Sequence, residues 1–272
     1  MTANGWVLAK LPNRKLNLKT KVEIMDESLI EKKNGNFANT VLGAVPSVVY
    51  NEDCVEGLKR FSDNHFDLCV TDPPYELTSG GGSRDIWGGF FKASEYDNKG
   101  KLFEIPKPEI WMAEIFRTLK EDADFYCFIN DKNLNYFLSI ALEVGFKLHN
   151  ILVMVKDTHT PNRWYIKNCE YVLYLYKGKA KNITNMGDKT ATNVQMPKNK
   201  IHPSEKPVSY IEKLIKNSCP KDGVIIEPFV GSGSCRLAAY QYCSFVGFEI
   251  DKDYYEAQEK RFKDFVSQLR MF

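Results

Sequence analysis

The 272-residue sequence predicts an α/β fold: a doubly wound, mostly parallel sheet with helices on both faces. Two observations predict this fold. From residue 48 onward, short apolar segments alternate with longer segments in which apolar residues recur every three or four positions. The apolar segments 149–155 and 171–176 follow each other without a helical segment between them, which indicates one antiparallel hairpin at an edge of the sheet.

The expected strands are short and rich in Val, Ile, Phe and Tyr. In chain order they are 48–51, 66–71, 125–130, 149–155, 171–176, 223–227 and 244–250. The expected helices share the helical period, and they are 108–120, 132–145, 207–218, 234–243 and 252–270. The last helix follows the stretch 251–253, whose aspartates offer an N-cap.

The composition fits one globular domain, because 43% of the residues are hydrophobic and 26% are charged. Residues 1–45 are polar, lysine-rich and weakly periodic, so we expect an N-terminal extension there and the main domain at 46–272. No apolar run approaches the length of a membrane span, and the N-terminus lacks the apolar core of a secretory signal. We therefore expect a cytoplasmic protein without membrane contact.

Neither cysteine nor histidine has the spacing of a metal site. The seven cysteines are odd in number, contain no CxxC pair and lie partly inside strand-like segments. This pattern favours reduced, buried thiols over a disulfide framework or a zinc site. We therefore expect no bound metal.

The first motif with chemical content is Asp72-Pro73-Pro74-Tyr75, directly after the strand 66–71. Two prolines fix φ and remove backbone donors, so the motif could simply be a stiff turn. It could also be a rigid clamp, because the Asp72 carboxylate and the Pro73 carbonyl are fixed acceptors and Tyr75 adds an aromatic face. Such a clamp suits a planar base that carries an NH₂ group.

The second motif is the stretch 224–234, VIIEPFVGSGS, which leads from a strand through a glycine-rich turn into a helix. Gly231 and Gly233 allow a ligand close to the backbone, and the helix start offers free N–H groups. A plain strand–helix turn and a dinucleotide site are the alternatives. The dinucleotide fingerprint needs a third glycine where this chain has Arg236.

Two acidic residues accompany the glycine turn. Glu227 closes the strand before it and could accept from an ammonium group. Glu249 ends the next strand, 18 residues after Gly231, where it could accept from ribose hydroxyls. A ligand with an amino-acid part and a ribose, but no pyrophosphate, fits these positions better than a dinucleotide does.

In its motifs and their order, the sequence resembles the beta class of DNA amino-methyltransferases. The matching segments are 50–58, 72–75, 202–207, 227–234 and 246–251. The resemblance spans about residues 47–265, with the catalytic motif before the methyl-donor loop. It implies a circularly permuted, Rossmann-like, seven-stranded methyltransferase sheet with one antiparallel edge strand, and a catalytic domain at 46–272.

The resemblance implies an enzyme that uses S-adenosylmethionine to methylate the exocyclic N6 amino group of adenine in double-stranded DNA. Asp72 and the Pro73 carbonyl would each accept one N–H of that amino group, and Tyr75 would stack on the flipped base. The implied catalytic residues are Asp72, Pro73, Pro74 and Tyr75. The implied donor contacts are Asp53, Cys54, Asp72, Lys206, Glu227, Pro228, Phe229, Gly231, Ser232, Gly233, Ser234 and Glu249.

Other functions stay open. The same clamp could hold the amino group of cytosine, giving a cytosine-N4 DNA methyltransferase, or an amino group of RNA or protein. A third class is a binding module without activity. We favour adenine, because cytosine-specific members of the family more often begin this motif with serine. A homodimer and a cognate restriction enzyme are partners that the resemblance suggests.

Basic residues are concentrated in one segment. Residues 177–206 hold seven lysines against two acidic residues, a net charge of +5 in a chain whose net charge is +2. In the resembled family, target recognition lies at this place, so we expect an insert at about 177–201 to read DNA. The alternative is a solvated loop. The glycine-rich stretch 76–108 is the expected mobile element that closes over the base.

One position departs from the family pattern. In the hairpin segment at 151–162, the family usually carries a tryptophan where this chain has Met154. Trp164 and Tyr165 lie nearby in sequence and could replace it as a contact to the base. We expect instead that both pack in the core under the hairpin.

Overall fold

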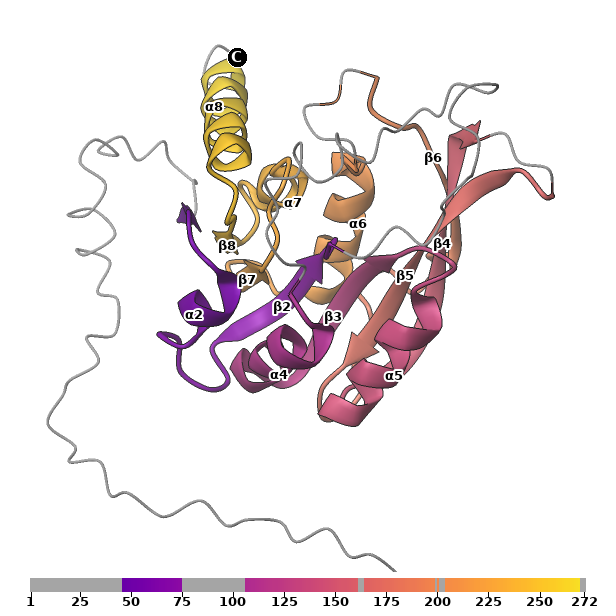
Figure 1. Ribbon diagram of the computed structural model, residues 1–272, viewed down its shortest axis with the longest axis horizontal. Coiled ribbons are helices and arrows are strands. Elements are labelled where there is room, and N and C mark those ends of the chain that lie inside the picture. The colour runs from indigo at the N-terminus through magenta and orange to yellow at the C-terminus, as the bar shows by residue number, and fades with distance from the viewer. Residues whose placement is uncertain (1–45, 75–105, 161–163, 199, 201–203, 270–272) are drawn as a thin grey trace, which may run out of the picture. The chain divides into compact units, whose positions relative to one another are not determined.

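The computed structural model describes residues 46–74, 106–160, 164–198, 200 and 204–269 (Figure 1). The expected N-terminal extension lies outside these residues. So do Tyr75 and most of the glycine-rich stretch 76–108. No described helix is long and apolar enough to cross a membrane.

In the described part of the chain, eight strands form one sheet, and helices connect most of them. The strands are β1 (Ser47–Tyr50), β2 (Phe66–Thr71), β3 (Leu119–Ile129), β4 (Lys147–Thr160), β5 (Lys167–Tyr176), β6 (Ala191–Val194), β7 (Val224–Glu227) and β8 (Ser244–Phe248). The helices are α2 (Cys54–Leu58), α4 (Pro108–Thr118), α5 (Leu134–Val144), α6 (Val208–Ser218), α7 (Ser234–Ala239) and α8 (Lys252–Leu269).

The sheet is doubly wound, as predicted. The strand order is β1-β8-β7-β2-β3-β5-β4-β6, and every neighbouring pair is parallel except the two pairs that β5 makes with β3 and β4. In Figure 1, α6, α7 and α8 lie on one side of the sheet and α2, α4 and α5 on the other.

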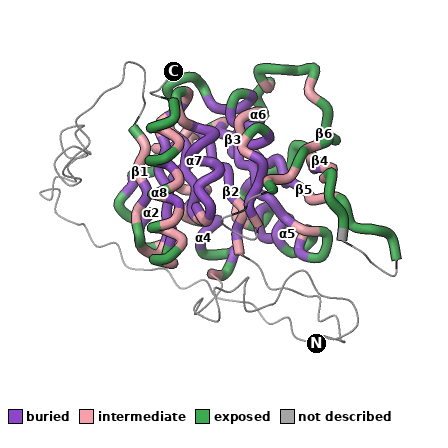
Figure 2. The backbone as a smooth tube through the Cα atoms, turned by 90° about the horizontal axis from the view of Figure 1, so that it is seen from above, coloured by how far each residue is buried: buried purple, intermediate pink, exposed green. Residues whose placement is uncertain are grey.

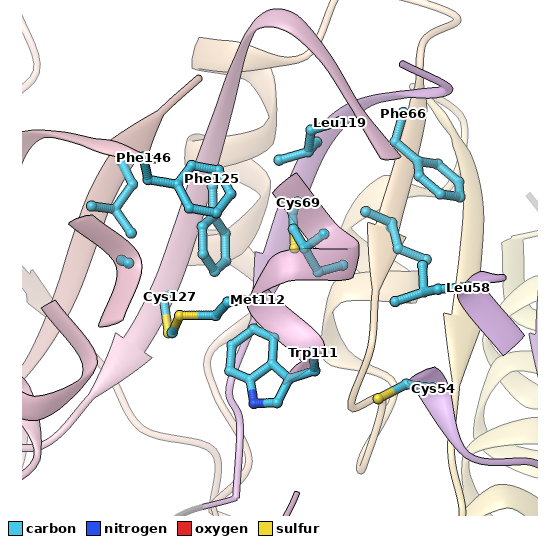
Figure 3. Packing of buried hydrophobic residues seen from close by; sticks show 14 of the residues in the cluster. Cys54, Leu58, Phe66, Cys69, Trp111, Met112, Leu119, Phe125, Cys127 and Phe146 are labelled. Atoms are coloured by element: carbon cyan, nitrogen blue, oxygen red, sulfur yellow. The ribbon is translucent and has the colours of Figure 1, made fainter. Parts of the chain in front are cut away.

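Alternate side chains of the central strands enter two separate cores. In β3, Phe125 and Cys127 pack with α2, α4 and α5, whereas Tyr126 and Phe128 pack with α6 and α7. Figure 3 shows the first core, where Trp111 of α4 lies beside Met112 and Cys127. Figure 2 shows β2 and β3 buried along the middle of the sheet. Burial on both faces explains why these strands read as continuous apolar runs in the sequence.

Two details of the predicted sheet are corrected. The sheet has eight strands instead of seven, because Ala191–Val194 pairs with β4 as strand β6. That strand has alternating exposed and half-buried residues at the edge of the sheet, so its sequence, ATNV, carries no hydrophobic signal. The antiparallel strand β5 lies inside the sheet, between β3 and β4, because it pairs with both of them.

Smaller features agree with the sequence. Asp251 caps α8, because its Oδ1 accepts from the backbone N–H groups of Asp253 at 2.9 Å and Tyr254 at 3.1 Å. All seven cysteine thiols are free and all except Cys169 are buried. Helix α2 was not predicted, because five residues are too few to show a helical period.

Candidate active site

Acidic residues follow the ends of four neighbouring strands. In the sheet order β1-β8-β7-β2 these residues are Asp53, Glu249, Glu227 and Asp72. The four strands are parallel, and Tyr50 pairs with Phe248, Glu227 with Gly247, and Cys69 with Ile226. Their carboxyl ends therefore meet at one edge of the sheet, where α/β folds place their ligands. We call this edge the active-site edge.

Asp72 at this edge faces Lys206. Asp72 Oδ2 accepts from Lys206 Nζ at 2.6 Å, and the same ammonium donates to Ser204 O at 3.1 Å. The carboxylate oxygen Glu170 Oε2 lies 3.2 Å from Lys206 Nζ. An ammonium has three N–H donors, so these three acceptors fix the Lys206 side chain, of which only 7% is exposed.

Glu170 extends this contact into a chain of alternating charges. Its second oxygen, Oε1, accepts from Lys156 Nζ of β4 at 3.1 Å. Glu170 lies on β5, where it pairs with Met154 in the register of the β4–β5 hairpin. We call Asp72, Lys206, Glu170 and Lys156 the lysine–carboxylate network. Its charges sum to zero, and each carboxylate has a lysine within hydrogen-bonding distance.

The two carboxylates of the network differ in acidity. Burial raises the pKa of Asp72 above its usual range, although the charge of Lys206 opposes this effect. Burial also acts to raise the pKa of Glu170, but Lys206 and Lys156 outweigh it and lower that pKa to about 2. Glu170 is thus ionised at neutral pH, and its negative charge adds to the rise in the pKa of Asp72.

The glycine turn after β7 has the backbone that its sequence predicts. Gly231 has a φ of 50° and Gly233 a φ of 75°, values that favour glycine. Arg261 of α8 holds the turn, because it donates to Ser232 O at 2.9 Å and forms an ion pair with Glu205 at 2.5 Å. The segment before α6 and helix α8 therefore support the turn from two directions.

Glu227 is a buried carboxyl group with an unused acceptor. Only 6% of the residue is exposed, and its Oε2 has no hydrogen-bond partner. Burial, reinforced by the charges of Asp72 and Glu249, holds its pKa well above the usual range. The hydroxyl of Thr71 is likewise buried without a partner. Unpaired buried polar groups are rare, and two of them line one cavity here.

This cavity joins the two motifs. Its wall includes Asp72 and Lys206 from the catalytic side and Glu227, Gly231 and Ser234 from the glycine turn. The remaining lining residues are Val70, Thr71, Phe128, Ser204, Ile211, Phe229, Val230 and Ser232. An acceptor that is buried, unpaired and acidic fits a ligand that brings a positive charge.

Glu249 is fixed by backbone groups. Its Oε2 accepts from Gly231 N at 2.8 Å, and its Oε1 accepts from Asp251 N at 2.9 Å. Burial raises its pKa to about 7, although these two N–H groups act to lower it. A carboxylate oxygen has further lone pairs, so Glu249 can still accept from a ligand hydroxyl.

Asp53 has a structural task that the sequence did not predict. It is the N-cap of α2, and its Oδ1 accepts from Val55 N at 2.9 Å and Glu56 N at 3.0 Å. Cys54 is the first residue of that helix. The cap uses Oδ1, so Oδ2 and the Cys54 amide are the groups that a ligand ring could contact. Phe229 packs edge-on against Trp111, with ring centroids 5.2 Å apart.

Most of the predicted site residues therefore share one edge of the sheet. The exception is Tyr75, which lies outside the described residues, so its predicted stacking role stays a prediction. Sequence reasoning missed Glu170, Lys156, Arg261 and Glu205. A signal was present for the first two, because each is a charged residue directly next to the apolar run of its strand. Among described residues, no group of three His, Cys, Asp or Glu side chains could hold a metal ion.

The expectation for Trp164 and Tyr165 was wrong. Trp164 is 71% exposed and Tyr165 95% exposed, so neither packs in the core. Met154, at the position where the family usually carries tryptophan, is fully buried. Trp164 and Tyr165 both lie in the connection between β4 and β5, beyond the paired residues of the sheet.

The seven lysines of residues 177–206 fall into a buried group and an exposed group. Lys177 is buried and donates to Asn64 Oδ1, Phe116 O and Leu119 O at 2.7 to 2.9 Å. Lys206 belongs to the lysine–carboxylate network. Of the seven lysines that we counted as one basic surface, these two are therefore internal, and the other five are exposed.

Comparisons with known proteins show which family and which fold the chain resembles. The family described as DNA methylase matches residues 66–260. The putative methylase YubD of Escherichia coli (strain K12) is 29% identical over 220 residues, which cover 77% of this chain and 87% of YubD. The M1.HpyAVI–SAM complex has a TM-score of 0.59 at 23% identity, covering 79% of this chain and 99% of that chain. The cytosine-N4-specific PvuII DNA methyltransferase has a TM-score of 0.63 at 17% identity, and the match covers 80% of this chain and 86% of the PvuII enzyme.

Proposed function

The chain belongs to the DNA methylase family, and we propose that it transfers a methyl group from S-adenosylmethionine to the exocyclic N6 amino group of adenine in duplex DNA. The observation that carries this proposal is the cavity that Asp72 shares with Glu227 and the glycine turn. A DNA methylase needs an amino-group clamp and a donor site in contact with each other. Residues that we assign to the two elements, Asp72 on one side and Glu227 and Gly231 on the other, line this one cavity.

The residues of the donor side fit S-adenosylmethionine. When bound, this donor supplies an electrophilic methyl group together with ammonium and sulfonium charges. Glu227, with its unpaired Oε2, would hold the ammonium group, and Glu249 would accept from the ribose hydroxyls. Asp53 and the Cys54 amide would hold the adenine ring of the donor, and the turn 229–234 would enclose its amino-acid part.

On the catalytic side, Asp72 and the Pro73 carbonyl each accept one N–H of the substrate amino group. This removes the nitrogen lone pair from conjugation with the ring and directs it at the methyl group. Positive charge develops on the nitrogen during transfer, so acceptors that are fixed beforehand stabilise the transition state selectively. The Asp72 carboxylate is also placed to take the proton that the nitrogen loses.

Lys206 would compete with the base for Asp72, because it already donates to Asp72 Oδ2. Glu170 resolves this competition, since its Oε2 is a second acceptor 3.2 Å from the same ammonium. Lys206 can stay on Glu170 while Asp72 accepts from the base. The ammonium is then never left buried without a partner, which would cost several kcal/mol.

Adenine is the proposed base because Asp72, not serine, begins the clamp. The runner-up is the N4 amino group of cytosine, since the similar PvuII structure is specific for that position. Incubation with radiolabelled donor and panels of DNA, RNA and protein acceptors tests the substrate class. Label in DNA alone is the expected result, and label only in RNA or protein would contradict the proposal.

The partners are proposals as well. Duplex DNA is the substrate, and a homodimer and a cognate restriction enzyme stay predictions from the family resemblance. Sedimentation at micromolar concentration, with and without DNA, tests the dimer. A monomer under both conditions would rule it out.

A further inference from the structure

The β4–β5 hairpin continues past the active-site edge. Strand β3 ends at Ile129, which pairs with Tyr171 of β5. Residues 167–170 of β5 pair with β4 alone. At about 3.3 Å per residue, these four residues extend the β4–β5 hairpin roughly 13 Å beyond the end of β3, and we call this extension the β4–β5 ribbon. Strand β6 flanks its base as far as Lys156, and its outer part is two-stranded. The ribbon begins at Glu170, so it leaves the sheet beside the lysine–carboxylate network (Figure 1).

The outer part of the ribbon carries exposed apolar side chains. Trp164 is 71% exposed, Tyr165 95% and Ile166 56%. They are consecutive in sequence, and Figure 2 shows this part of the hairpin as exposed. Three large apolar residues in a row on a surface mark a place of contact with a partner more often than an ordinary surface. Their position places that contact at the active-site edge.

Two exposed lysines lie beside the ribbon. Strand β6 runs parallel to β4 with Val194 opposite Lys156, and Met196 N donates to Asp157 Oδ1 at 3.0 Å. The chain that follows, with Lys198 and Lys200, therefore lies next to the hairpin. Lys200 is also close enough to Glu170 and Lys206 for their charges to interact.

Lys179 and Lys181 lie at the opposite end of the sheet. The Lys179 backbone N–H donates to Asp122 Oδ1 at 2.7 Å, and the charge of Lys181 acts on Asp124. Both aspartates belong to the first half of β3, whose far end, Ile129, lies at the active-site edge. At about 3.3 Å per residue, Asp122 is roughly 20 Å from that end.

We infer that the β4–β5 ribbon enters the major groove of the target duplex, with Trp164, Tyr165 and Ile166 against the bases and Lys198 and Lys200 against the phosphates. This inference rests on the proposed function and deepens it. It moves the DNA-reading surface from the whole segment 177–201 to the hairpin and the end of that segment.

The shape and the positive charge of this surface fit duplex DNA as its partner. A two-stranded β-ribbon fits the major groove, and apolar side chains there contact thymine methyl groups. The flipped base must reach Asp72, so the duplex has to lie over the edge from which the ribbon projects. Phosphates flank the major groove, so the exposed lysines beside the apolar tip of the ribbon fit a position next to the DNA backbone.

The test compares duplex binding by fluorescence anisotropy, using the DNA sequence that the wild-type protein methylates in co-expressed DNA. Trp164→Ala/Tyr165→Ala is expected to weaken binding about tenfold or more, as for loss of aromatic–base contacts. Lys198→Ala/Lys200→Ala is expected to lower the slope of log affinity against log salt by up to about 2. Donor affinity, measured by calorimetry, is expected to stay unchanged in both.

Two matched control variants remove the same kinds of side chain, lysines and an exposed apolar residue, from other parts of the surface. Lys179→Ala/Lys181→Ala removes two exposed lysines from the opposite end of the sheet, and Met186→Ala removes an apolar residue that is 76% exposed. Both are expected to bind DNA as the wild type does. Equal loss in the control lysine pair would assign the effect to net charge and overturn the inference.

The outcomes separate this inference from the proposed function. If the wild-type protein methylates no DNA, the proposed function fails and the inference fails with it. If the wild type methylates duplex DNA and Trp164→Ala/Tyr165→Ala binds that duplex equally well, only the inference fails. If that variant keeps its DNA affinity but dissociates a dimer in sedimentation, the surface belongs to a second copy of the chain and the inference is again overturned.

Discussion

The carboxyl groups on the proposed donor side and on the proposed catalytic side of the active-site edge differ in what neutralises them. On the donor side, Glu227 has an oxygen without a partner and Glu249 is bound by backbone N–H groups. On the catalytic side, Asp72 and Glu170 contact Lys206 and Lys156. Among the described residues, Glu227 and Glu249 thus form no ion pair, whereas Asp72 and Glu170 each have a lysine partner.

This difference matches the charges of the proposed ligands. S-adenosylmethionine brings cationic groups, so a donor site with its own lysines would repel it. The amino group of adenine is neutral, so an unpaired carboxylate beside it would face a large desolvation cost. The following variants test the comparison, from the largest expected effect to the smallest.

The largest effect is expected for Asp72→Ala. It removes one preorganised acceptor from the clamp, and such losses lower the rate about a hundredfold to a thousandfold. Single-turnover methyl transfer measures the rate, and calorimetry with the donor is expected to show nearly unchanged affinity. Near-wild-type transfer by this variant would end the clamp hypothesis.

Glu227→Gln is expected to act on binding instead. Loss of a buried charge partner weakens affinity by about 2 kcal/mol or more, roughly thirtyfold. The unliganded protein is expected to be at least as stable as the wild type, because an unpaired buried carboxyl group is replaced by a neutral one. Calorimetry and chemical unfolding measure the two quantities.

The matched control for Glu227→Gln is Glu256→Gln on α8, where the side chain is 64% exposed. This variant is expected to change neither donor affinity nor unfolding. Equal donor affinity in Glu227→Gln and the wild type would remove Glu227 from the donor site.

The pKa of Glu249 predicts how stability depends on pH. This pKa is about 7 in the folded protein against 4.5 as the ordinary value, so the folded state binds the extra proton between these pH values. The contribution to stability is fully present below pH 4.5 and is lost as pH rises to about 7, by roughly 3 kcal/mol at most. Unfolding of the unliganded protein across this range measures it.

In Glu249→Gln this part of the pH dependence is expected to disappear. Donor affinity of the wild type should rise over the same interval, because ribose hydroxyls donate to the ionised carboxylate. A stability curve that is equally steep in the variant would assign the titration to another group, of which Glu227 is the first to examine.

The smallest effects are expected in the lysine–carboxylate network, and they have opposite signs. The rate of methyl transfer should rise with pH as Asp72 ionises, at a pH above the ordinary range for aspartate. Glu170→Gln removes a neighbouring negative charge, so this rise should move to lower pH. Lys156→Gln removes the positive charge that balances Glu170, so the rise should move to higher pH. A shift in the same direction for both would indicate a merely structural role.

The sequence predicted the central sheet and the donor turn well because their signals are local. Strands β2 and β7 are buried on both faces, and Gly231 and Gly233 occupy backbone conformations that favour glycine. Asp72 and Glu227 could be placed together because both end parallel strands. Strand β6 escaped prediction because an edge strand with alternating exposure needs no apolar residues.

The features that could not be predicted from the sequence depend on contacts between residues that are far apart in the chain. Lys206 and Asp72 are 134 positions apart, and although the family resemblance assigns both to the donor site, neither motif indicates that they form an ion pair. A count of lysines likewise cannot show that Lys177 is held inside the fold by carbonyl groups. We expected Trp164 and Tyr165 to pack in the core, but both lie in the connection between β4 and β5 and are exposed there.

The central claim is that the clamp at Asp72 methylates N6 of adenine, and the methylated base itself tests it most directly. DNA co-expressed with the wild-type protein or with Asp72→Ala would be digested to nucleosides and separated by liquid chromatography with mass spectrometry. We predict N6-methyladenine with the wild-type protein and none above background with the variant. N4-methylcytosine as the only product, or N6-methyladenine at equal levels with Asp72→Ala, would contradict the account.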